Sequence, residues 1–526
     1  MANFEQTFKN IDDLLYKDSG ADSEIDYIEQ TSWVLFLRYL DSFDKNREDE
    51  ATLEGKNHTS ILEPKFQWEN WAAPKNDKGE IDIHKALIGP DLVKFVEFEL
   101  FPYLASFKEK HIDNPKTIEY KIGEIFSELS NKIKSGYNMR EIINMVDGLP
   151  FGTSVDKHEL SHLYETKIKN MGNAGRNGGQ YYTPRPLIRA MIALIEPKIG
   201  EKIYDPACGS GGMFVQSIKF IENHHGNKKE ISIYGQEYTA TTYKLAKMNL
   251  AIRGIAANLG DVPADTFGKD QHPDLKADFI MANPPFNQKD WRASDELTDD
   301  PRWRGYDVPP TSNANYAWIL NMVAKLSENG VAGFILANGA LSGGGEEYKI
   351  RRKLIENDLV EAIVILPRNM FYTTDISVTL WILNKNKKAR TVQLPDAVRN
   401  YRDRQHEILF LDLREKGIPF EKKYTQFSDE NIIEITEAYH NWQTNLTKYQ
   451  DVPEFCYAAS IDEIVAKDYS LVPSKYITFI NRDENIDFED KMKSLQTEFS
   501  ELLKAEEQSK NDLLTVFKEL GYAIEL

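Results

Sequence analysis

The stretch EKIYDPACGSGGMF, residues 201–214, decides the fold class of this chain. A short β-rich run ends at an acid and a proline and is followed by glycines at positions 209, 211 and 212. Glycine permits the tight turn and close backbone approach that a nucleoside-bearing cofactor needs after a strand. A dinucleotide-binding fold is a rival, but its G-x-G-x-x-G fingerprint would need glycine where Phe214 stands. The stretch therefore predicts a strand and a cofactor-binding turn, and other residues must identify the cofactor.

Further β-rich runs follow at intervals, with helical segments between them. This alternation predicts right-handed crossovers and an α/β fold with a doubly wound, mostly parallel, Rossmann-like sheet of seven strands. In such sheets ligands bind at the carboxyl ends of the strands. The runs are SIYGQE (232–237), ADFIMAN (277–283), VAGFILAN (331–338), VEAIVILP (360–367) and ISVTLWILN (376–384).

The regions that flank these strands have different sequence patterns. Phe8, Ile11 and Leu15 fall at helical spacing and no strand pattern appears before residue 165, so we predict a helical N-terminal domain. The Gly- and Asn-rich stretch 170–186 is expected to be a loop at a domain boundary. The predicted domains are 1–165 (helical), 166–390 (catalytic), 391–480 (a smaller mixed α/β extension of the catalytic domain) and 481–526 (a C-terminal helix).

The predicted C-terminal helix carries an apolar stripe. Phe488, Met492, Leu495, Phe499 and Leu502 alternate spacings of four and three residues, which is typical of a helix that packs along one face. The stripe indicates either packing on the helix's own domain or binding to a partner.

Composition limits the classes of function. With 526 residues, 41% hydrophobic and 28% charged, the chain is an ordinary soluble protein of two or three domains. No apolar leader or membrane-length apolar stretch occurs, so we expect a cytoplasmic protein. Cys208 and Cys456 are too few for a disulfide framework, and the scattered histidines predict no metal site. The net charge of −19 argues against tight, unassisted binding of nucleic acid over a large surface.

Polar residues stand at the ends of the successive predicted strands. Glu237 closes the second run, where its carboxylate could accept both hydroxyls of a ribose. Asp261 follows the third strand, within reach of an adenine amino group, and Asn283 ends the fourth. A single acid at such a place is usually a solvated loop residue. The ordered set, together with the glycine turn, favours a shared nucleoside site.

The order QYYTP, DPACGSGG, Glu237, Asp261 and NPPF resembles the S-adenosylmethionine-dependent amino-methyltransferases of the γ order that modify adenine in DNA. The helical N-terminal region, LPRNMFYTTDISVTLWIL and DYSLVPSKY resemble, more closely, the modification (M) subunits of type I restriction-modification systems. Tyr182 stands where phenylalanine is also frequent in the family. This resemblance covers most of the chain.

The resemblance implies a role for each motif. It assigns the catalytic motif to Asn283, Pro284, Pro285 and Phe286, the ribose to Glu237 and the cofactor's adenine to Asp261. It assigns the rest of the S-adenosylmethionine site to Gln180, Tyr181, Tyr182, Thr183, Pro184, Arg185, Asp205, Pro206, Ala207, Gly209, Ser210, Gly211 and Gly212. It also implies partners: double-stranded DNA, a specificity (S) subunit that binds two M chains, and a restriction (R) subunit in the larger complex.

The Asn-Pro-Pro-Phe sequence suits amine methylation. The exocyclic amine of adenine is a poor nucleophile, because its lone pair is delocalised into the ring. Asn283 Oδ1 and the Pro284 carbonyl can accept hydrogen bonds from this amine and stabilise the positive charge that develops on it. The prolines hold these acceptors in place, and Phe286 would stack on an adenine that has left the duplex.

Two further assignments concern DNA. The long segment 287–315 is expected either to close over the displaced base and touch phosphates through Arg302, Trp303 and Arg304, or to be an ordinary surface excursion. Phe371 is expected either to form the second side of the base pocket or to be a core aromatic.

The chain lacks some functions that a complete restriction enzyme needs. No phosphate-binding G-x-x-x-x-G-K-[ST] loop is present, and the region after residue 390 is short for a target-recognition domain. We therefore expect a catalytic subunit that takes its sequence specificity from a partner. The alternatives are methylation of protein glutamine or of RNA, a cofactor-binding scaffold without catalysis and, more distantly, a dehydrogenase.

Overall fold

The computed structural model describes residues 2–76, 78–82, 84–114, 117–149, 183–224, 226, 230–371, 377–393, 398–420, 424–480 and 488–519. The chain divides into two compact units, Met1–Ile477 and Thr478–Leu526. Among the described residues no helix combines the length and apolar character that a membrane crossing requires.

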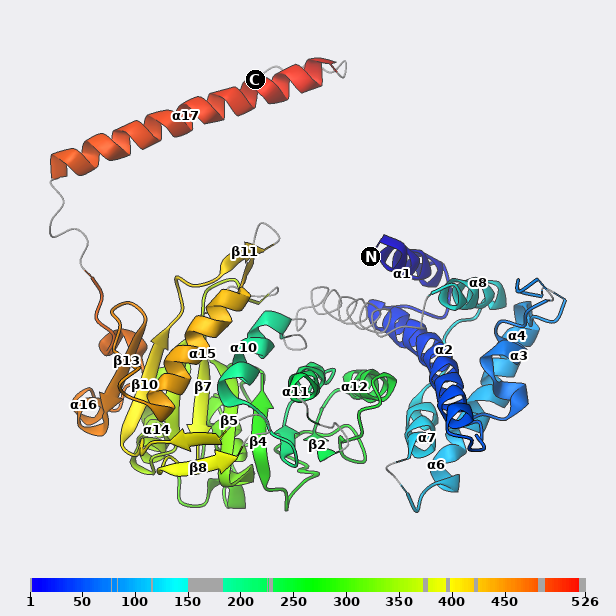
Figure 1. Ribbon diagram of the computed structural model, residues 1–526, viewed down its shortest axis with the longest axis horizontal. Helices are drawn as coiled ribbons and strands as arrows, with labels where there is room; N and C mark the ends of the chain where they lie inside the picture. Colours follow the sequence, from blue (N-terminus) through cyan, green and yellow to red (C-terminus); the bar gives the residue numbers. More distant parts are fainter. Residues whose placement is uncertain are drawn as a thin grey trace. The chain divides into compact units, whose positions relative to one another are not determined.

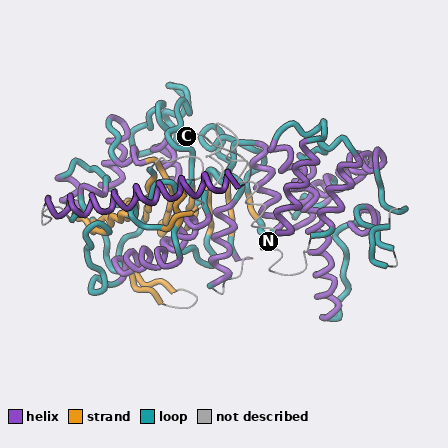
Figure 2. Tube along the Cα trace, turned by 90° about the horizontal axis from the view of Figure 1, so that it is seen from above, coloured by secondary structure: helices purple, strands orange, loops and turns teal. Residues whose placement is uncertain are grey.

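The N-terminal region is helical, as predicted (Figure 2). Its longest helix, α2, begins after Ser23, whose hydroxyl accepts a hydrogen bond from the Asp26 N–H at 3.2 Å. Trp33 of α2 packs edge-to-face on Phe101 in a core that is continuous through this region. The main helices are α1 (Ala2–Tyr16), α2 (Glu24–Leu53), α4 (Gly89–Phe95), α7 (Ile118–Glu128) and α8 (Gly136–Asp147), with shorter turns α3 (Trp68–Trp71), α5 (Phe101–Ala105) and α6 (Phe107–Lys110).

The catalytic region is built on one sheet, with strand order β13-β10-β6-β7-β5-β4-β1-β2-β3 (Figure 1). The strands pair in parallel from β3 to β5, and β7 runs antiparallel between β5 and β6. The predicted doubly wound, mostly parallel sheet is confirmed. The strands are β1 (Lys202–Asp205), β2 (Ser232–Gly235), β3 (Ala257–Asn258), β4 (Ala277–Ala282), β5 (Leu326–Ala337), β6 (Val360–Ile365), β7 (Val378–Asn384), β10 (Glu407–Asp412) and β13 (Cys456–Ser460).

The sheet has nine strands where seven are predicted. β10 adds in parallel beyond β6, and β13 adds antiparallel to β10. The region 391–480 therefore extends the catalytic sheet itself. It also holds two small hairpins, β8 (Arg390–Gln393) with β9 (Val398–Tyr401), and β11 (Ile418–Phe420) with β12 (Tyr424–Gln426).

Alternate residues of the strands enter two cores on the two faces of the sheet. Ile203 and Phe279 belong to one core, while their neighbours Tyr204 and Ile280 belong to the other. The first core is shared with α10 (Arg185–Ile195), α11 (Gly212–Asn223), α12 (Ala240–Ile252) and α15 (Asp429–Thr444), and the second with α13 (Asn315–Lys325), α14 (Gly345–Glu356) and α16 (Ile461–Ala466) (Figure 1). This layering leaves the carboxyl ends of the parallel strands available for ligands.

In the second unit the described residues form the helix α17 (Phe488–Glu519). Its predicted apolar stripe faces solvent: Leu495 is 46%, Phe499 63% and Leu502 62% exposed. The helix therefore presents an apolar face that the described residues of its own unit do not cover.

Candidate active site

The glycine-rich turn connects β1 to α11 in a backbone conformation that favours glycine. Gly209 and Gly211 have φ values of 54° and 79°. Among the described residues, no atom lies within 4 Å of the place that a Cβ on Gly212 would occupy, so they leave open space there. The turn therefore has the backbone conformation and the open space that the sequence predicts for a cofactor-binding turn.

Asp205 ends β1 at the base of this turn. Its side chain is buried, and its Oδ1 accepts a hydrogen bond from the Ala207 N–H at 2.9 Å. Burial, with a smaller contribution from the neighbouring Glu237 carboxylate, raises the pKa of Asp205 to about 8 against the opposing effect of that hydrogen bond. A buried acid that holds a proton near neutral pH is a feature of sites that bind charged ligands.

Glu237 lies directly after β2 and is hydrogen-bonded to the same turn. Its carboxylate accepts from the Gly209 N–H at 3.1 Å and from the Thr239 N–H at 2.8 Å. Burial raises the pKa of Glu237, although these N–H groups act in the opposite direction. The structure therefore brings together two of the acids singled out in the sequence.

Asp261 follows β3 after a turn at Gly260, which has a φ of 82°. The Asp261 N–H donates to Gln271 Oε1 at 2.8 Å, and the Tyr243 hydroxyl donates to the Gly260 carbonyl at 2.6 Å. The Asp261 residue itself is exposed. Hydrogen bonds therefore fix the backbone at Gly260 and Asp261, while the Asp261 residue faces solvent.

Asn283 stands at the end of β4, directly after Ala282. Its Nδ2 donates to Thr183 Oγ1 at 2.9 Å. Its Oδ1 is buried, and within the described part of the chain this atom has no hydrogen-bond partner. Because an unsatisfied buried acceptor is costly, this oxygen indicates a donor that arrives with a ligand.

Two aromatic rings meet beside Asn283. The Phe286 and Phe371 ring centroids are 6.0 Å apart, at an interplanar angle of 88°. Phe286 is partly buried and Phe371 is buried in the core that contains the glycine turn. The arrangement places Phe371 next to the Asn-Pro-Pro-Phe motif, as the base-pocket prediction requires, and also in the core, as the alternative requires.

Two family models match successive parts of the chain. Residues 155–485 match the family described as N-6 DNA Methylase, and residues 4–145 match the HsdM N-terminal domain. This chain is a member of the N-6 DNA methylase family.

Relatives place the methylase among the type I restriction enzymes. The type I restriction enzyme HindI methylase subunit of Haemophilus influenzae is 42% identical over 342 residues, which cover 64% of this chain and 73% of the relative. The MjaIX methylase subunit of Methanocaldococcus jannaschii is 34% identical over 424 residues, which cover 79% and 72%. The methylase is therefore a type I modification subunit, and the predicted resemblance is confirmed.

Solved structures confirm the fold. A modification subunit of a putative type I restriction enzyme from Vibrio vulnificus gives a TM-score of 0.70 at 24% identity, with 88% of this chain and 93% of that chain covered. The methyltransferase subunit of a type I restriction-modification system from Streptococcus thermophilus gives a TM-score of 0.64 at 22% identity, with 90% and 98% covered.

The segment 287–315 of the methylase does not present its predicted DNA-binding residues as expected. Arg302 is buried and pairs with Asp300 at 2.7 Å, while its guanidinium also donates to the carbonyls of Thr266 and Phe267. Trp303 is also buried, at 2% exposed. Both side chains are used in folding the segment, and their contact with DNA stays a prediction. Arg304 is exposed.

Some supporting residues of the methylase site are not evident from the sequence. Asn315, at the start of α13, accepts from the Asn287 N–H at 3.0 Å and donates to Asn287 Oδ1 at 2.9 Å. This pair fixes the chain directly after Phe286. Tyr238, 74% exposed beside Glu237, is a further candidate for ligand contact. The signal for Tyr238 in the sequence is its position directly after Glu237, the acid at the end of a strand.

The predicted residues Gln180, Tyr181 and Tyr182 lie outside the described part of the methylase. Thr183 from the same motif is described, and it reaches Asn283 rather than the glycine turn. Pro184 and Arg185 open α10, where Pro184 occupies the position before the first helical residue.

Proposed function

We propose that this methylase transfers the methyl group of S-adenosylmethionine to N6 of adenine in double-stranded DNA. The observation that carries this proposal is the buried Asn283 Oδ1, which lacks a hydrogen-bond donor within the described residues. An amino group of a displaced adenine is a donor of the right kind. S-adenosylmethionine, when bound, supplies an electrophilic methyl group attached to a sulfonium.

The acidic residues around the glycine turn fit a positively charged nucleoside cofactor. Asp205 and Glu237 are buried carboxyl groups with raised pKa values, which a nearby positive charge would lower again. Asp261 and Glu237 follow adjacent strands and are assigned to the adenine and the ribose. Open space beside Gly212 leaves room for the remainder of the cofactor.

The Asn-Pro-Pro-Phe motif would act on the adenine amine. Asn283 Oδ1 and the Pro284 carbonyl accept its two N–H groups and stabilise the positive charge that forms on nitrogen, which afterwards loses a proton to water. Thr183 holds the Asn283 amide from the other side, so the acceptor is oriented before the substrate arrives. Phe286 and Phe371 would contact the faces or edges of the extruded base.

The partners are proposed from the family and from α17. We expect an S subunit that binds two M chains and supplies sequence specificity, and an R subunit in the larger complex. The exposed stripe of α17 is the candidate docking surface for the S subunit. Deleting residues 485–526 should abolish co-purification with the S subunit while leaving S-adenosylmethionine affinity unchanged, and a truncated chain that still co-purifies would contradict this assignment.

The function is tested by transfer of labelled methyl groups to genomic DNA. Three samples are compared: the chain alone, the chain with its S subunit, and the same complex with Asn283→Ala. We expect label at adenine N6 only in the wild-type complex. Efficient labelling by the chain alone would place recognition within this chain. Label in protein or RNA and none in DNA would favour the alternative amino-methyltransferase functions.

A further inference from the structure

Helix α12 belongs to two hydrophobic cores at once. Tyr243, Ala246 and Leu250 lie in the core beneath the catalytic sheet, whereas Leu245 and Met248 lie in the core of the N-terminal helical region. The helix follows Glu237 directly in sequence and leads to β3 and Asp261. One element therefore contacts both the proposed cofactor site and the N-terminal region.

On the side of the cofactor site, α12 supports both the glycine turn and the Asp261 turn. The Tyr243 hydroxyl donates to the Gly260 carbonyl at 2.6 Å, and Asn249 Nδ2 donates to the Ser210 carbonyl at 2.7 Å. Leu250 Cγ lies 3.3 Å from the place that a Cβ on Gly211 would occupy. The positions of both turns therefore depend on the position of this helix.

On the other side, lysines of α12 meet acids of the N-terminal region. Lys247 Nζ lies 3.6 Å from Glu124 and 3.7 Å from Glu128, both in α7, and Lys244 Nζ lies 3.5 Å from Glu29 in α2. The Lys247 ammonium also stands over the Tyr243 ring, 4.3 Å from its centroid. Lys247 is thus shared between the N-terminal acids and the tyrosine that fixes the Asp261 turn.

The border between the two regions is only partly filled. A cavity of about 530 Å³ lies between α7 and β3, and Tyr120, Lys247 and Asp261 all line it. Among the described residues beyond 149, those that enter the core of the N-terminal region all belong to α12: Leu245, Met248 and the partly buried Ala251. A contact of this kind transmits a displacement through few side chains.

We propose that α12 couples the affinity for S-adenosylmethionine to the seating of the N-terminal helical region, meaning the packing of that region against α12. Tyr243 is the positioning residue for Asp261, and Lys247 is the link to α7. The inference rests on the proposed function, because it assumes that Asp261 contacts the cofactor. Coupling of this kind is reciprocal: cofactor binding stabilises the seated N-terminal region to the same extent that seating strengthens cofactor binding.

The test measures S-adenosylmethionine binding by calorimetry on the full chain and its variants. Tyr243→Phe removes only the hydroxyl, and Lys247→Met removes only the charge. We expect each to raise the Kd by about three- to tenfold, the effect of losing one buried polar interaction. The double variant should lose less than the product of the two single effects, because the two side chains act through one contact.

Tyr476→Phe is the matched control. The Tyr476 hydroxyl donates to the Ser470 carbonyl at 2.5 Å and belongs to the other core of the sheet, so its loss should leave the Kd unchanged. In the complex with the S subunit, kcat at saturating cofactor should stay within twofold of wild type for all variants, since the effect is on affinity. A raised Kd with an unchanged kcat would not result from a general loss of stability.

Three outcomes would overturn the inference. The first is an unchanged Kd in Tyr243→Phe and Lys247→Met, and the second is full multiplicativity of their effects. The third is a fall in kcat with no change in Kd. If the wild-type chain binds no S-adenosylmethionine, the proposed function fails and this inference fails with it. Normal wild-type binding with unaffected variants overturns the inference alone.

Discussion

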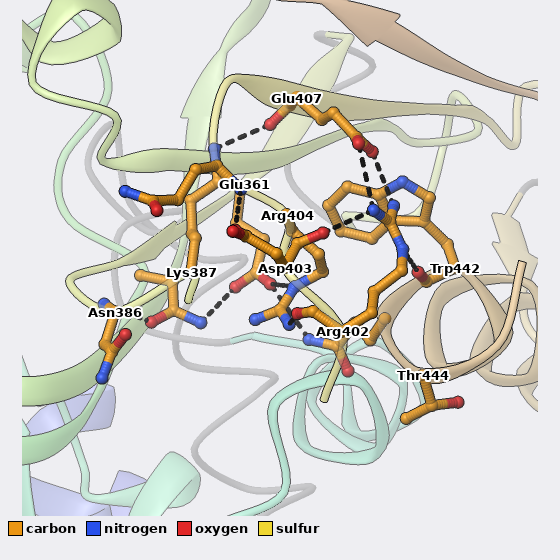
Figure 3. A network of polar contacts seen from close by, with 12 residues as sticks. Glu361, Asn386, Lys387, Arg402, Asp403, Arg404, Glu407, Trp442 and Thr444 are labelled. Carbon is orange, nitrogen blue, oxygen red and sulfur yellow. Dashed lines mark hydrogen bonds and ion pairs between the residues drawn. The ribbon is translucent and has the colours of Figure 1, made fainter. Parts of the chain in front are cut away.

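Asp205 and Glu237 at the carboxyl edge of the sheet are buried with raised pKa values, whereas Glu361 in β6 of the same sheet is buried with a lowered one. Burial by itself raises the pKa of Glu361, but Arg404 reverses the effect by pairing with it at 2.9 Å (Figure 3). Asp205 accepts a hydrogen bond from a backbone N–H group, and Glu237 accepts from backbone N–H groups and from the Thr239 side chain.

The two clusters show how the partners of a buried acid indicate its role. Glu361 and Arg404 are each 0% exposed, and Asn384 and Gln443 donate further hydrogen bonds to the same carboxylate. The charge on Glu361 is therefore compensated within the fold. Asp205 accepts from a backbone N–H group and has no cation among the groups that shift its pKa. Within the described residues, Asn283 Oδ1 has no hydrogen-bond donor. A buried acid whose pKa stays raised is therefore a candidate for ligand binding, whereas one whose pKa is lowered by a buried cation belongs to the scaffold.

The largest effect is expected on stability, from Glu361→Gln. The substitution leaves the Arg404 charge buried without its partner, and it should lower the free energy of unfolding by about 3–5 kcal/mol in urea titrations. Glu407→Gln is the control, because the Arg402–Glu407 pair at 2.6 Å is partly exposed and its loss should cost about 1 kcal/mol or less. Equal losses in both variants would remove the distinction between the clusters.

The next largest effect is expected on catalysis, from Asn283→Ala. Loss of a preorganised acceptor should lower kcat for methyl transfer about 10²- to 10³-fold. Stability should change by only about 1 kcal/mol, since the side chain gives up one hydrogen bond to Thr183. Kinetics of the S-subunit complex and thermal unfolding of the chain check the two parts. A large loss of stability would place Asn283 with the scaffold.

A smaller effect is expected from Thr183→Val. The isosteric change removes the oxygen that holds the Asn283 amide, so the acceptor is less well oriented. We expect kcat to fall about tenfold, which corresponds to about 1.4 kcal/mol. Thr183→Ser keeps the hydroxyl and should retain most of the activity. If valine and serine give the same rate in the methyl-transfer assay, the Thr183 hydrogen bond does not orient the amide.

The last effect is expected from Asp205→Asn, and it depends on pH. Because the folded pKa of about 8 exceeds the ordinary 3.8, the folded chain keeps a proton that the unfolded chain has lost. Asp205 therefore contributes stability that weakens as pH rises from 3.8 to about 8. Urea titrations at pH 6 and 8 without cofactor should show a shallower pH dependence of the free energy of unfolding in Asp205→Asn, because asparagine has no proton to lose in this range. An unchanged slope would show that Asp205 does not carry the proton.

The sequence predicts the strands and the strand-end residues well, because each depends on local signals. The β-rich runs and the glycine turn define β1 to β7, and Asn-Pro-Pro-Phe marks the end of β4. The orientation of the Asn283 amide depends on Thr183, 100 residues away, which no local pattern reveals. The same limit applies to β10 and β13, whose apolar residues predict strands without indicating the sheet that they join.

Arg302 and Trp303 show a different limit. A basic residue beside an aromatic one in a long loop is a reasonable sign of nucleic-acid contact, but the same residue types can fold the loop itself. Arg302 is neutralised by Asp300 and lies 5.8 Å from the Phe267 ring centroid, so its role depends on neighbours that the pattern does not contain. Helix α12 is similar, because no local pattern in the sequence reveals that its residues enter two separate cores.

The exposed stripe of α17 also sets a condition on how the chain is produced. A helix of 32 residues is about 48 Å long, and apolar side chains along such a length promote self-association when nothing covers them. Chains made in excess of the protein that covers the stripe are therefore expected to aggregate or to be degraded. Balanced synthesis of the two proteins, from neighbouring reading frames for example, would keep the pool of orphan subunits small.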